Sequence, residues 1–190
     1  VGIDESYKVF EGDLGEQTLE ILKYCNDGVQ FLLFSPTFPT EVFSVMDQYM
    51  KDPVKILVKL NIDNIKQFYV NVESSINKFP TLIDIYGSVS IQKAVIFANT
   101  KETVEYLDNQ FKENEFQISA IHGGMEQVER DKVMQQFRTG KTRALVSTDL
   151  LARGIDVQQI TLVINFELPR SNENYLHRIG RSGRYGRKGV

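Results

Sequence analysis

The unbroken apolar run from Ala94 to Ala98 constrains the fold more than any other feature of the sequence. A strand with one face in water alternates apolar and polar residues, whereas a strand covered on both faces is apolar throughout. Other short β-rich runs recur along the chain, and stretches with helical spacing of apolar residues separate them. We therefore expect an α/β fold with a parallel sheet flanked by helices.

The expected elements alternate between strand and helix along most of the chain. Strands are predicted over residues 29–34, 54–58, 67–72, 94–98, 118–121, 143–147 and 161–165. Helices are predicted over residues 39–50, 104–111, 126–137 and 172–179. Aromatic residues within strand runs, such as Tyr69, are expected in the core. The polar stretch 59–66 predicts a linker between a domain over residues 1–58 and a second domain over residues 67–190.

Composition and charge narrow the classes of protein and of partner. The chain of 190 residues has a single cysteine, so it cannot form an intrachain disulfide. Its longest apolar runs, such as Phe31 to Phe34, are far too short to span a bilayer. The net charge is -3, but residues 168–190 hold six basic side chains and one acidic one. A polyanion would therefore find its partner charges near the C-terminal end.

The segment H-R-I-G-R-S-G-R, His177 to Arg184, carries the strongest chemical signal. Arginines recur every third residue from Arg178 to Arg187, and glycines recur every third residue from Gly180 to Gly189. Repeated glycine weakens a helix, so we expect the segment to leave its helix near Gly180. Guanidinium groups in a glycine-rich loop suit phosphate oxygens. The composition alone leaves open a second interpretation, a flexible Gly/Arg tail that binds RNA loosely.

A second polar segment, T-D-L-L-A-R-G-I-D from Thr148 to Asp156, follows a predicted strand. In isolation it is also compatible with a loop in which Asp149 caps a helix. Together, in this order and spacing, the two segments resemble motifs V and VI of the DEAD-box RNA helicases. Four further stretches resemble motif II, motif III, motif IV and the H-G-D segment with motif IVa: Asp4–Tyr7, Ser35–Thr37, Ala94–Thr100 and Ile121–Arg130. Within the family, the resemblance is to the translation initiation factor 4A type.

The resemblance implies two RecA-like lobes that close on ATP and on one RNA strand. Residues 1–58 would be the C-terminal part of lobe one, and residues 67–190 would be lobe two. Arg181 and Arg184 would act as arginine fingers on the γ-phosphate, and Asp156 would touch the nucleotide ribose. Asp4 would help to hold Mg²⁺ through water, and Glu5 would orient the attacking water. ATP and Mg²⁺ are thus the implied cofactors.

The same resemblance assigns residues to interlobe coupling and to RNA. Ser35, Thr37 and His177 would couple the motifs of the two lobes. Residues along the RNA backbone would be Thr100, Gly123, Gln127, Arg130, Thr148 and Arg153. Contacts to phosphates and sugars carry no base sequence, so binding should be sequence-tolerant and sensitive to salt. Protein regulators, a monomeric state and a cytoplasmic location are also implied, with the nucleus as the alternative location.

The sequence departs from the family pattern at four points. It contains no phosphate-binding loop of the form G-x-x-x-x-G-K-S/T, so we expect a fragment that does not hydrolyse ATP alone. Tyr7 stands at the fourth position of motif II, where the family has an acid, and Pro36 replaces the alanine of motif III. Gly124 replaces the aspartate of H-G-D, which removes a negative charge beside the expected RNA path. Tyr7 and Pro36 keep one alternative open, a catalytically weakened RNA-binding or scaffold protein. A related helicase that acts on DNA is a further alternative.

Overall fold

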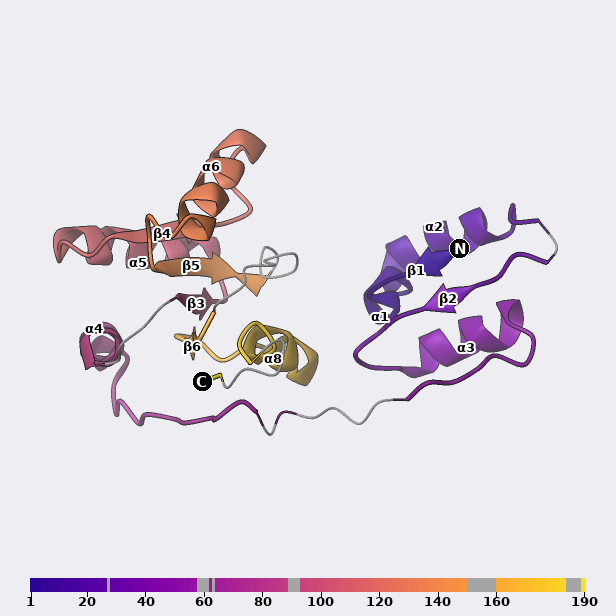
Figure 1. Ribbon diagram of the computed structural model, residues 1–190, viewed down its shortest axis with the longest axis horizontal. Coiled ribbons are helices and arrows are strands. Elements are labelled where there is room, and N and C mark those ends of the chain that lie inside the picture. Colours follow the sequence, from indigo (N-terminus) through magenta and orange to yellow (C-terminus); the bar gives the residue numbers. More distant parts are fainter. Residues whose placement is uncertain (27, 58–61, 63, 89–92, 150–159, 184–188) are drawn as a thin grey trace. The chain divides into compact units, whose positions relative to one another are not determined.

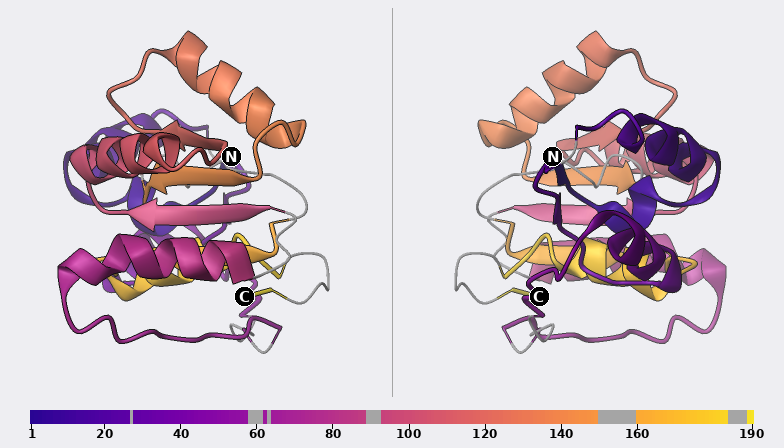
Figure 2. Two further views of the ribbon diagram at one scale, coloured as in Figure 1. Left: turned by 90° about the vertical axis from the view of Figure 1, so that its left-hand side faces the viewer. Right: turned by 90° about the vertical axis from the view of Figure 1, so that its right-hand side faces the viewer.

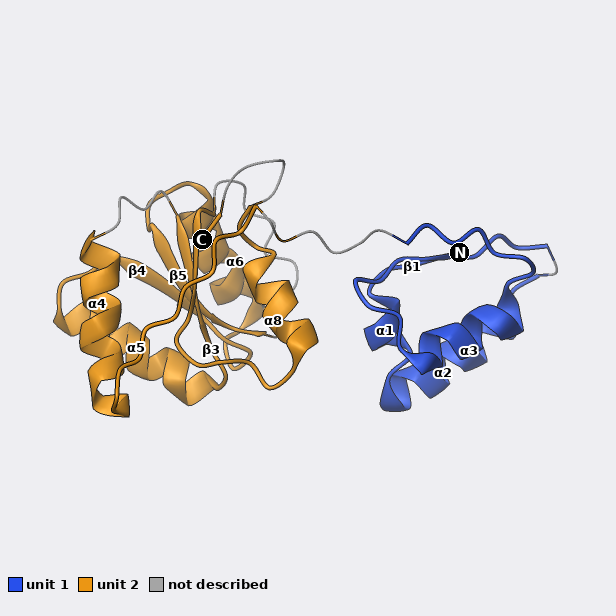
Figure 3. Cartoon of the chain, turned by 90° about the horizontal axis from the view of Figure 1, so that it is seen from below, with its two compact units in different colours: residues 1–60 blue, residues 61–190 orange. Residues whose placement is uncertain are grey.

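The computed structural model of the chain describes residues 1–26, 28–57, 62, 64–88, 93–149, 160–183 and 189–190. The chain divides into two compact units, Val1–Leu60 and Asn61–Val190 (Figure 3). This boundary falls within residues 59–66, where the sequence predicts a linker. Within the described residues, no helix is long and apolar enough to cross a lipid bilayer.

Unit 1 is a small α/β layer built on one pair of short parallel strands. The strands are β1 (Gly2–Ile3) and β2 (Leu32–Leu33), and β2 is much shorter than the strand predicted over residues 29–34. The helices are α1 (Ser6–Val9), α2 (Gly12–Leu22) and α3 (Thr40–Tyr49). The core of the unit contains Ile3, Phe10, Leu22, Val42, Val45 and Met46. The strand predicted over residues 54–58 is wrong over its described part, residues 54–57, which form no regular element.

Unit 2 contains a four-stranded parallel sheet, which confirms the predicted α/β class. The strands are β3 (Ala94–Ala98), β4 (Ile118–Ile121), β5 (Ala144–Thr148) and β6 (Leu162–Asn165). Their order in the sheet is β4-β5-β3-β6, and every neighbouring pair is parallel. Figure 2 shows β3 and β5, the pink and orange arrows, running in the same direction.

Helices cover both faces of this sheet, and this explains why the β3 run is apolar throughout. The helices are η1 (Ser75–Asn77), α4 (Lys78–Ser88), α5 (Lys101–Glu113), α6 (Gln127–Arg138) and α8 (Asn172–Ile179). Figure 1 labels the four α-helices. Ala94, Ile96 and Ala98 pack with α4 and α5. Val95 and Phe97 face the opposite way and pack with α6. Figure 3 shows α4 and α5 on one side of the strands and α6 and α8 on the other.

Two short stretches extend the sheet beyond β6. Val190 accepts a hydrogen bond from the backbone N–H of Val163 at 2.7 Å and donates one to Thr161 at 3.0 Å. Ile65 forms a parallel bridge with Gly189 on the outer side. The strand predicted over residues 67–72 is wrong, because these residues form no strand and the side chain of Tyr69, expected in the core, is 93% exposed.

Candidate functional site

Polar residues of unit 2 gather where the parallel strands end. Asn99 follows β3, His122 follows β4, Asp149 follows β5 and Glu167 lies just after β6. The strand ends are in register, since Ala98 pairs with Thr148. In open parallel sheets this carboxyl edge is where ligands bind. The fold therefore brings together the loops that the sequence marks as chemical.

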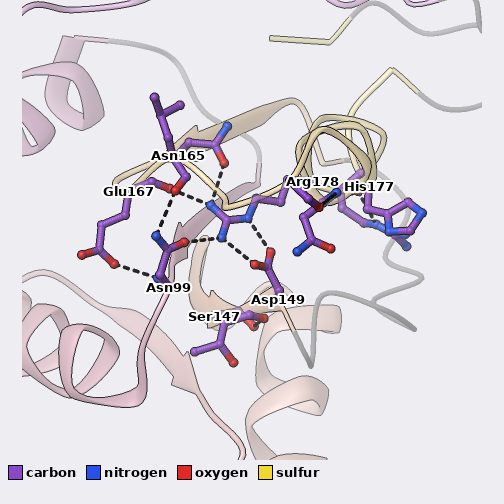
Figure 4. Close-up of polar contacts among 12 residues, drawn as sticks. Asn99, Ser147, Asp149, Asn165, Glu167, His177 and Arg178 are labelled. Atoms are coloured by element: carbon purple, nitrogen blue, oxygen red, sulfur yellow. Dashed lines mark hydrogen bonds and ion pairs between the residues drawn. The ribbon is translucent and has the colours of Figure 1, made fainter. Parts of the chain in front are cut away.

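Arg178, in the last turn of α8, is the centre of a buried polar network at this edge (Figure 4). Its side chain is 0% exposed. Its guanidinium donates from Nε and Nη2 to the two carboxylate oxygens of Asp149. Nη2 also donates to Asn99 Oδ1 at 2.7 Å, and Nη1 donates to Asn165 Oδ1 at 3.1 Å and to the Glu167 carbonyl at 2.7 Å. These contacts use all five N–H groups that an arginine has.

The network links the loops after three strands to α8. Asn99 strengthens it, because its backbone N–H donates to Glu167 Oε2 at 2.7 Å and its side-chain amide donates to the Leu168 carbonyl at 2.9 Å. The Arg178 guanidinium also lies over the Phe97 ring, 5.2 Å from its centroid. A buried charge is stable only when it is paired and fully hydrogen-bonded, and removing its partner costs about 3–5 kcal/mol. This network therefore fixes the position of α8 against the sheet.

The local sequence explains where α8 begins and ends. Ser171 caps the helix by accepting a hydrogen bond from the Asn174 backbone N–H at 3.2 Å. The helix ends at Ile179 and the next residue is Gly180, as the glycine repeat predicts. A Cβ on Gly180 would lie 2.9 Å from the Leu176 carbonyl oxygen, so a side chain does not fit there.

Arg181 follows this helix end and is partly exposed. Its backbone N–H donates to the Arg178 carbonyl at 3.1 Å, and its Nε donates to the His177 carbonyl at 3.1 Å. Arg181 therefore lies directly beyond the buried anchor, with part of its side chain reaching solvent. His177, on the preceding turn of α8, is half-buried.

The start of α5 lies at the same edge. Thr100 caps this helix, because its hydroxyl accepts a hydrogen bond from the Thr103 backbone N–H at 3.1 Å. A backbone hydrogen bond at the helix start and a second one from the Thr100 hydroxyl lower the pKa of Glu102. His122 Nδ1 accepts from the Gly124 N–H at 3.2 Å, while Nε2 lies 3.5 Å from a carboxylate oxygen of Glu105. The ring of His122 is thus engaged inside the protein.

The remaining residues predicted to contact RNA are placed as follows. Gly123 is exposed in the turn after β4, and Thr148 ends β5. Thr100, Gly123 and Thr148 thus follow or end three adjacent strands at one edge. Gln127 begins α6, where its side chain donates to Asp131 at 2.8 Å. Arg130, one turn later, has a buried Nε with no hydrogen-bond partner among the described residues.

In unit 1, the motif II and motif III stretches lie against each other. The Tyr7 backbone N–H donates to the Ser35 hydroxyl at 3.3 Å. Asp4 is exposed and accepts from the Glu5 N–H at 2.9 Å, while Glu5 has a left-handed backbone with φ of 52°. Thr37, in the second stretch, is partly exposed. Proximity of the two stretches follows from the parallel pairing of β1 with β2.

Comparison with known proteins shows the family of the chain. The model of the helicase conserved C-terminal domain matches residues 77–186. The chain belongs to this helicase family. The match covers β3 to β6, α8 and the whole Arg178 network, so the site lies within the conserved helicase domain.

Similar proteins place this helicase chain among the DEAD-box type, as its motifs predict. It is 50% identical to the ATP-dependent RNA helicase eIF4A of Candida albicans and 47% identical to eukaryotic initiation factor 4A of Caenorhabditis elegans. Each alignment covers 99% of this chain and 48% of the relative. The chain therefore spans about half the length of these curated relatives.

Solved structures show the same likeness. Dbp5 of S. cerevisiae bound to RNA and ADP BeF3 matches with a TM-score of 0.89 and 33% identity, over 100% of this chain and 51% of that one. A DEAD box protein from Methanococcus jannaschii matches with a TM-score of 0.64 and 36% identity, over 99% of this chain and 51% of that one. These likenesses confirm the predicted RecA-like architecture of the helicase domain.

Three predicted site residues, Arg153, Asp156 and Arg184, lie outside the described residues. Conversely, sequence reasoning missed the four partners that form the anchor with Asp149: Asn99, Asn165, Glu167 and Arg178. One signal was present for Arg178, which falls inside the predicted helix 172–179, whereas the later arginines follow Gly180. Within the described part of the helicase chain, no cluster of three or more His, Cys, Asp or Glu side chains could hold a metal.

Proposed function

We propose that this chain is the second half of an ATP-dependent RNA helicase that couples ATP hydrolysis to RNA binding and local duplex unwinding. The matching relatives are named ATP-dependent RNA helicases and are about twice as long as this chain. The observation that carries the proposal is the buried Arg178 network, which holds α8 at the carboxyl edge and places Arg181 just beyond it.

The chemistry of the site suits phosphoryl transfer. This reaction depends on positioning and charge neutralisation, and an arginine finger contributes about 10³–10⁵ in rate. Arg181, with Arg184 three residues later, would supply that charge. Their electrostatic effect requires a fixed backbone, because a flexible donor would lose much of its advantage to reorganisation. The anchored helix end supports a positioned arginine over the loose Gly/Arg tail that composition left open.

Unit 1 would provide the carboxylate that helps to hold the magnesium ion of such a reaction. Mg²⁺ keeps several waters and is usually held by one or two carboxylates together with substrate phosphates. Asp4 fits this demand because it is exposed and uses Oδ1 for the Glu5 N–H. Asp4 would contact the hydrated ion, which would neutralise phosphate charge when bound. Glu5 would orient the attacking water, and Asp156 would contact the ribose.

RNA is the proposed polymer. Thr100, Gly123 and Thr148 share one edge of the sheet and offer hydroxyl and backbone groups of the kind that bind phosphates and sugars. Gln127, Arg130 and Arg153 would support the same surface, as the family pattern implies. Such binding would be largely independent of base sequence and would weaken as salt rises.

Coupling, partners and location are also proposed from the family. Ser35, Thr37 and His177 would link the nucleotide and RNA sites. Solved structures of Dbp5 contain Gle1 and Nup159, so protein regulators are proposed for this chain as well. A helicase of the initiation factor type would act as a monomer in the cytoplasm, with the nucleus as the alternative.

The decisive experiment joins this chain to an upstream segment that completes lobe one and carries a phosphate-binding loop. ATP hydrolysis by this two-lobe protein is measured with and without single-stranded RNA, and single-stranded DNA of the same sequence is the comparison. We expect strong stimulation by RNA, weaker stimulation by DNA, and loss of both in Arg181→Ala. Equal stimulation by DNA would indicate a helicase that also acts on DNA. RNA binding without ATP hydrolysis would show that the protein binds RNA but is not an ATP hydrolase.

A second candidate is an RNA-binding protein with a weakened motor. Tyr7 favours it, because its side chain packs against the hydrophobic core of unit 1 and carries no charge at neutral pH. Pro36 also removes a backbone donor from the motif III stretch. The double variant Tyr7→Asp with Pro36→Ala discriminates between the two. A large gain in unwinding would support the weakened motor, whereas an unchanged rate would favour the full helicase.

A further inference from the structure

We infer that residues Asn64–Gln67, which we name the lead-in segment, position Arg181, just after α8, for catalysis. The chain passes through this segment soon after the boundary between the two units. Two separate contacts join it to α8 and to the turn that follows. This inference rests on the proposed function, and it identifies Gln67, Tyr175 and Gly189 as positioning residues.

The first contact is a side-chain hydrogen bond. The phenol of Tyr175, in the middle of α8, donates to Gln67 Oε1 at 2.6 Å. Tyr175 lies one turn before Arg178 and Arg181 lies just after the helix. A displacement of Gln67 would therefore act on the same short helix that presents Arg181.

The second contact passes through Gly189. Its backbone N–H donates to the Asn64 carbonyl at 2.9 Å, and its carbonyl accepts from the Lys66 N–H at 2.9 Å. Gly189 also lies against the turn after α8, where a Cβ would come 2.5 Å from the Gly183 nitrogen and 2.6 Å from the Ser182 hydroxyl. Only glycine allows this close approach of two backbones. Gly189 thus lies between the lead-in segment and the turn after α8 and contacts both. We call this layered arrangement the stack.

The stack and the Arg178 network hold α8 at different points. Arg178 ties the helix to the loops after β3, β5 and β6. The lead-in segment ties the same helix, and the turn beyond it, to the part of the chain that leads out of unit 1. A misplacement of about 1 Å at a reacting group can lower a rate by about 10². A change in the path of the lead-in segment is therefore expected to alter the reach of Arg181.

Removing one hydroxyl tests this coupling with little structural disturbance. In the two-lobe protein, Tyr175→Phe should lower kcat for RNA-stimulated ATP hydrolysis by about threefold to tenfold. KM for ATP should stay within about twofold, because a finger arginine acts mainly in the transition state. Tyr69→Phe is the matched control, since Tyr69 lies in the following stretch and its side chain is 93% exposed. It should leave both constants unchanged.

The acceptor side provides a rescue. Gln67→Leu should reproduce the loss seen with Tyr175→Phe, whereas Gln67→Glu keeps an oxygen acceptor and should retain most of kcat. A loss that is equal in the Leu and Glu variants, or one that falls on KM alone, would overturn the inference. Gly189→Ala should be more severe, but its loss of activity is interpreted only if the sheet stays folded.

Hydrogen exchange tests the coupling without any enzyme activity. The amides of Arg181 and Ser182 are hydrogen-bonded to the Arg178 and Ile179 carbonyls at 3.1 and 3.0 Å. Gln67→Leu should speed their exchange by about fivefold or more, while the amides of Ala94–Ala98 keep their wild-type rates. If the wild-type protein does not hydrolyse ATP, the proposed function fails, but this measurement still decides the coupling. Unchanged exchange, or faster exchange with wild-type kcat, would reject it.

Discussion

Arg178 and Arg181 lie three residues apart, yet they occupy opposite surroundings. Arg178 is fully buried, and all five of its N–H groups have protein acceptors. Arg181 is partly exposed, and its Nε donates to the local His177 carbonyl. A regular repeat of one residue type thus contains an anchor and a group that can meet a ligand. The repeat itself does not separate the two roles.

The position of the helix end separates them. Arg178 lies within α8, and its side chain faces the sheet. The helix ends before Gly180, so the backbone at Arg181 is no longer part of it. Arginine suits both surroundings, because its planar fork pairs bidentately with a carboxylate in the core and with a phosphate at the surface. The comparison can be tested by removing each arginine and measuring rate and stability separately.

Arg181→Ala should give the largest effect, and it should fall on the rate alone. We expect kcat for RNA-stimulated ATP hydrolysis by the two-lobe protein to drop by about 10³ or more. The free energy of opening, measured by hydrogen exchange at β3, should change by less than about 0.5 kcal/mol, as for a surface substitution. If Arg181→Ala also lowered the stability clearly, Arg181 would be a second anchor of α8. The contrast between Arg178 and Arg181 would then not hold.

Arg178→Met should give the reverse pattern. It leaves the Asp149 carboxylate without its bidentate partner, so unit 2 should lose about 3–5 kcal/mol of stability. Exchange of the slowest β3 amides measures this loss. Arg138→Met is the control, because Arg138 is an exposed arginine at the end of α6 and should cost less than about 0.5 kcal/mol. Equal costs for the two variants would contradict the anchor role.

Asn99→Leu sharpens the comparison, because it keeps the charge pair while it removes the acceptor of one Arg178 N–H and the donor to the Leu168 carbonyl. Arg178 would retain Asp149, Asn165 and the Glu167 carbonyl but would lose the contact of Nη2 with Asn99 Oδ1. An unsatisfied buried donor costs about 1–3 kcal/mol. We expect a stability loss of this size from chemical denaturation, smaller than that of Arg178→Met. No loss would mean that water replaces the amide oxygen.

The sequence predicted the sheet well because burial leaves a pattern in the chain. The predicted strands 94–98 and 118–121 have the observed bounds, and 143–147 is displaced by a single residue. The run 67–72 carries the same β-forming residue types but lies outside the sheet, where Tyr69 is exposed. Residue type shows that a segment is able to form a strand, but whether it forms one depends on the neighbours with which it can pair and pack.

The anchor could not be predicted in the same way. Its contacts join residues that are 79, 29 and 13 positions apart, and no local spacing reports such distances. The ends of the strands were predictable, so Thr100, Gly123 and Thr148 could be expected near one another. Whether Arg178 or Arg181 would turn inward depended on the side of the helix end on which each one lies.

The smallest expected effect concerns a lysine whose pairing is incomplete. Lys101 Nζ lies 3.6 Å from a Glu105 oxygen, and the Lys101 side chain is 50% exposed. A Cβ on Gly124 would lie 3.1 Å from Lys101 Cδ and 3.2 Å from its Nζ, so Gly124→Asp would place a carboxylate beside the ammonium. Neutralising this cation should weaken single-stranded RNA binding by about twofold to fivefold at low salt.

Gly124→Asn separates charge from shape in this last case. It adds a side chain of the same size without the charge, and Lys101 can move because the contact involves the far end of its flexible stem. Titration of labelled RNA at low and at high salt provides the measurement. The difference between the Asp and Asn variants should shrink as salt rises, since screening weakens an exposed ion pair. Equal losses in both variants would place the effect in the turn of Gly124, and Lys101 would then be no part of the RNA surface.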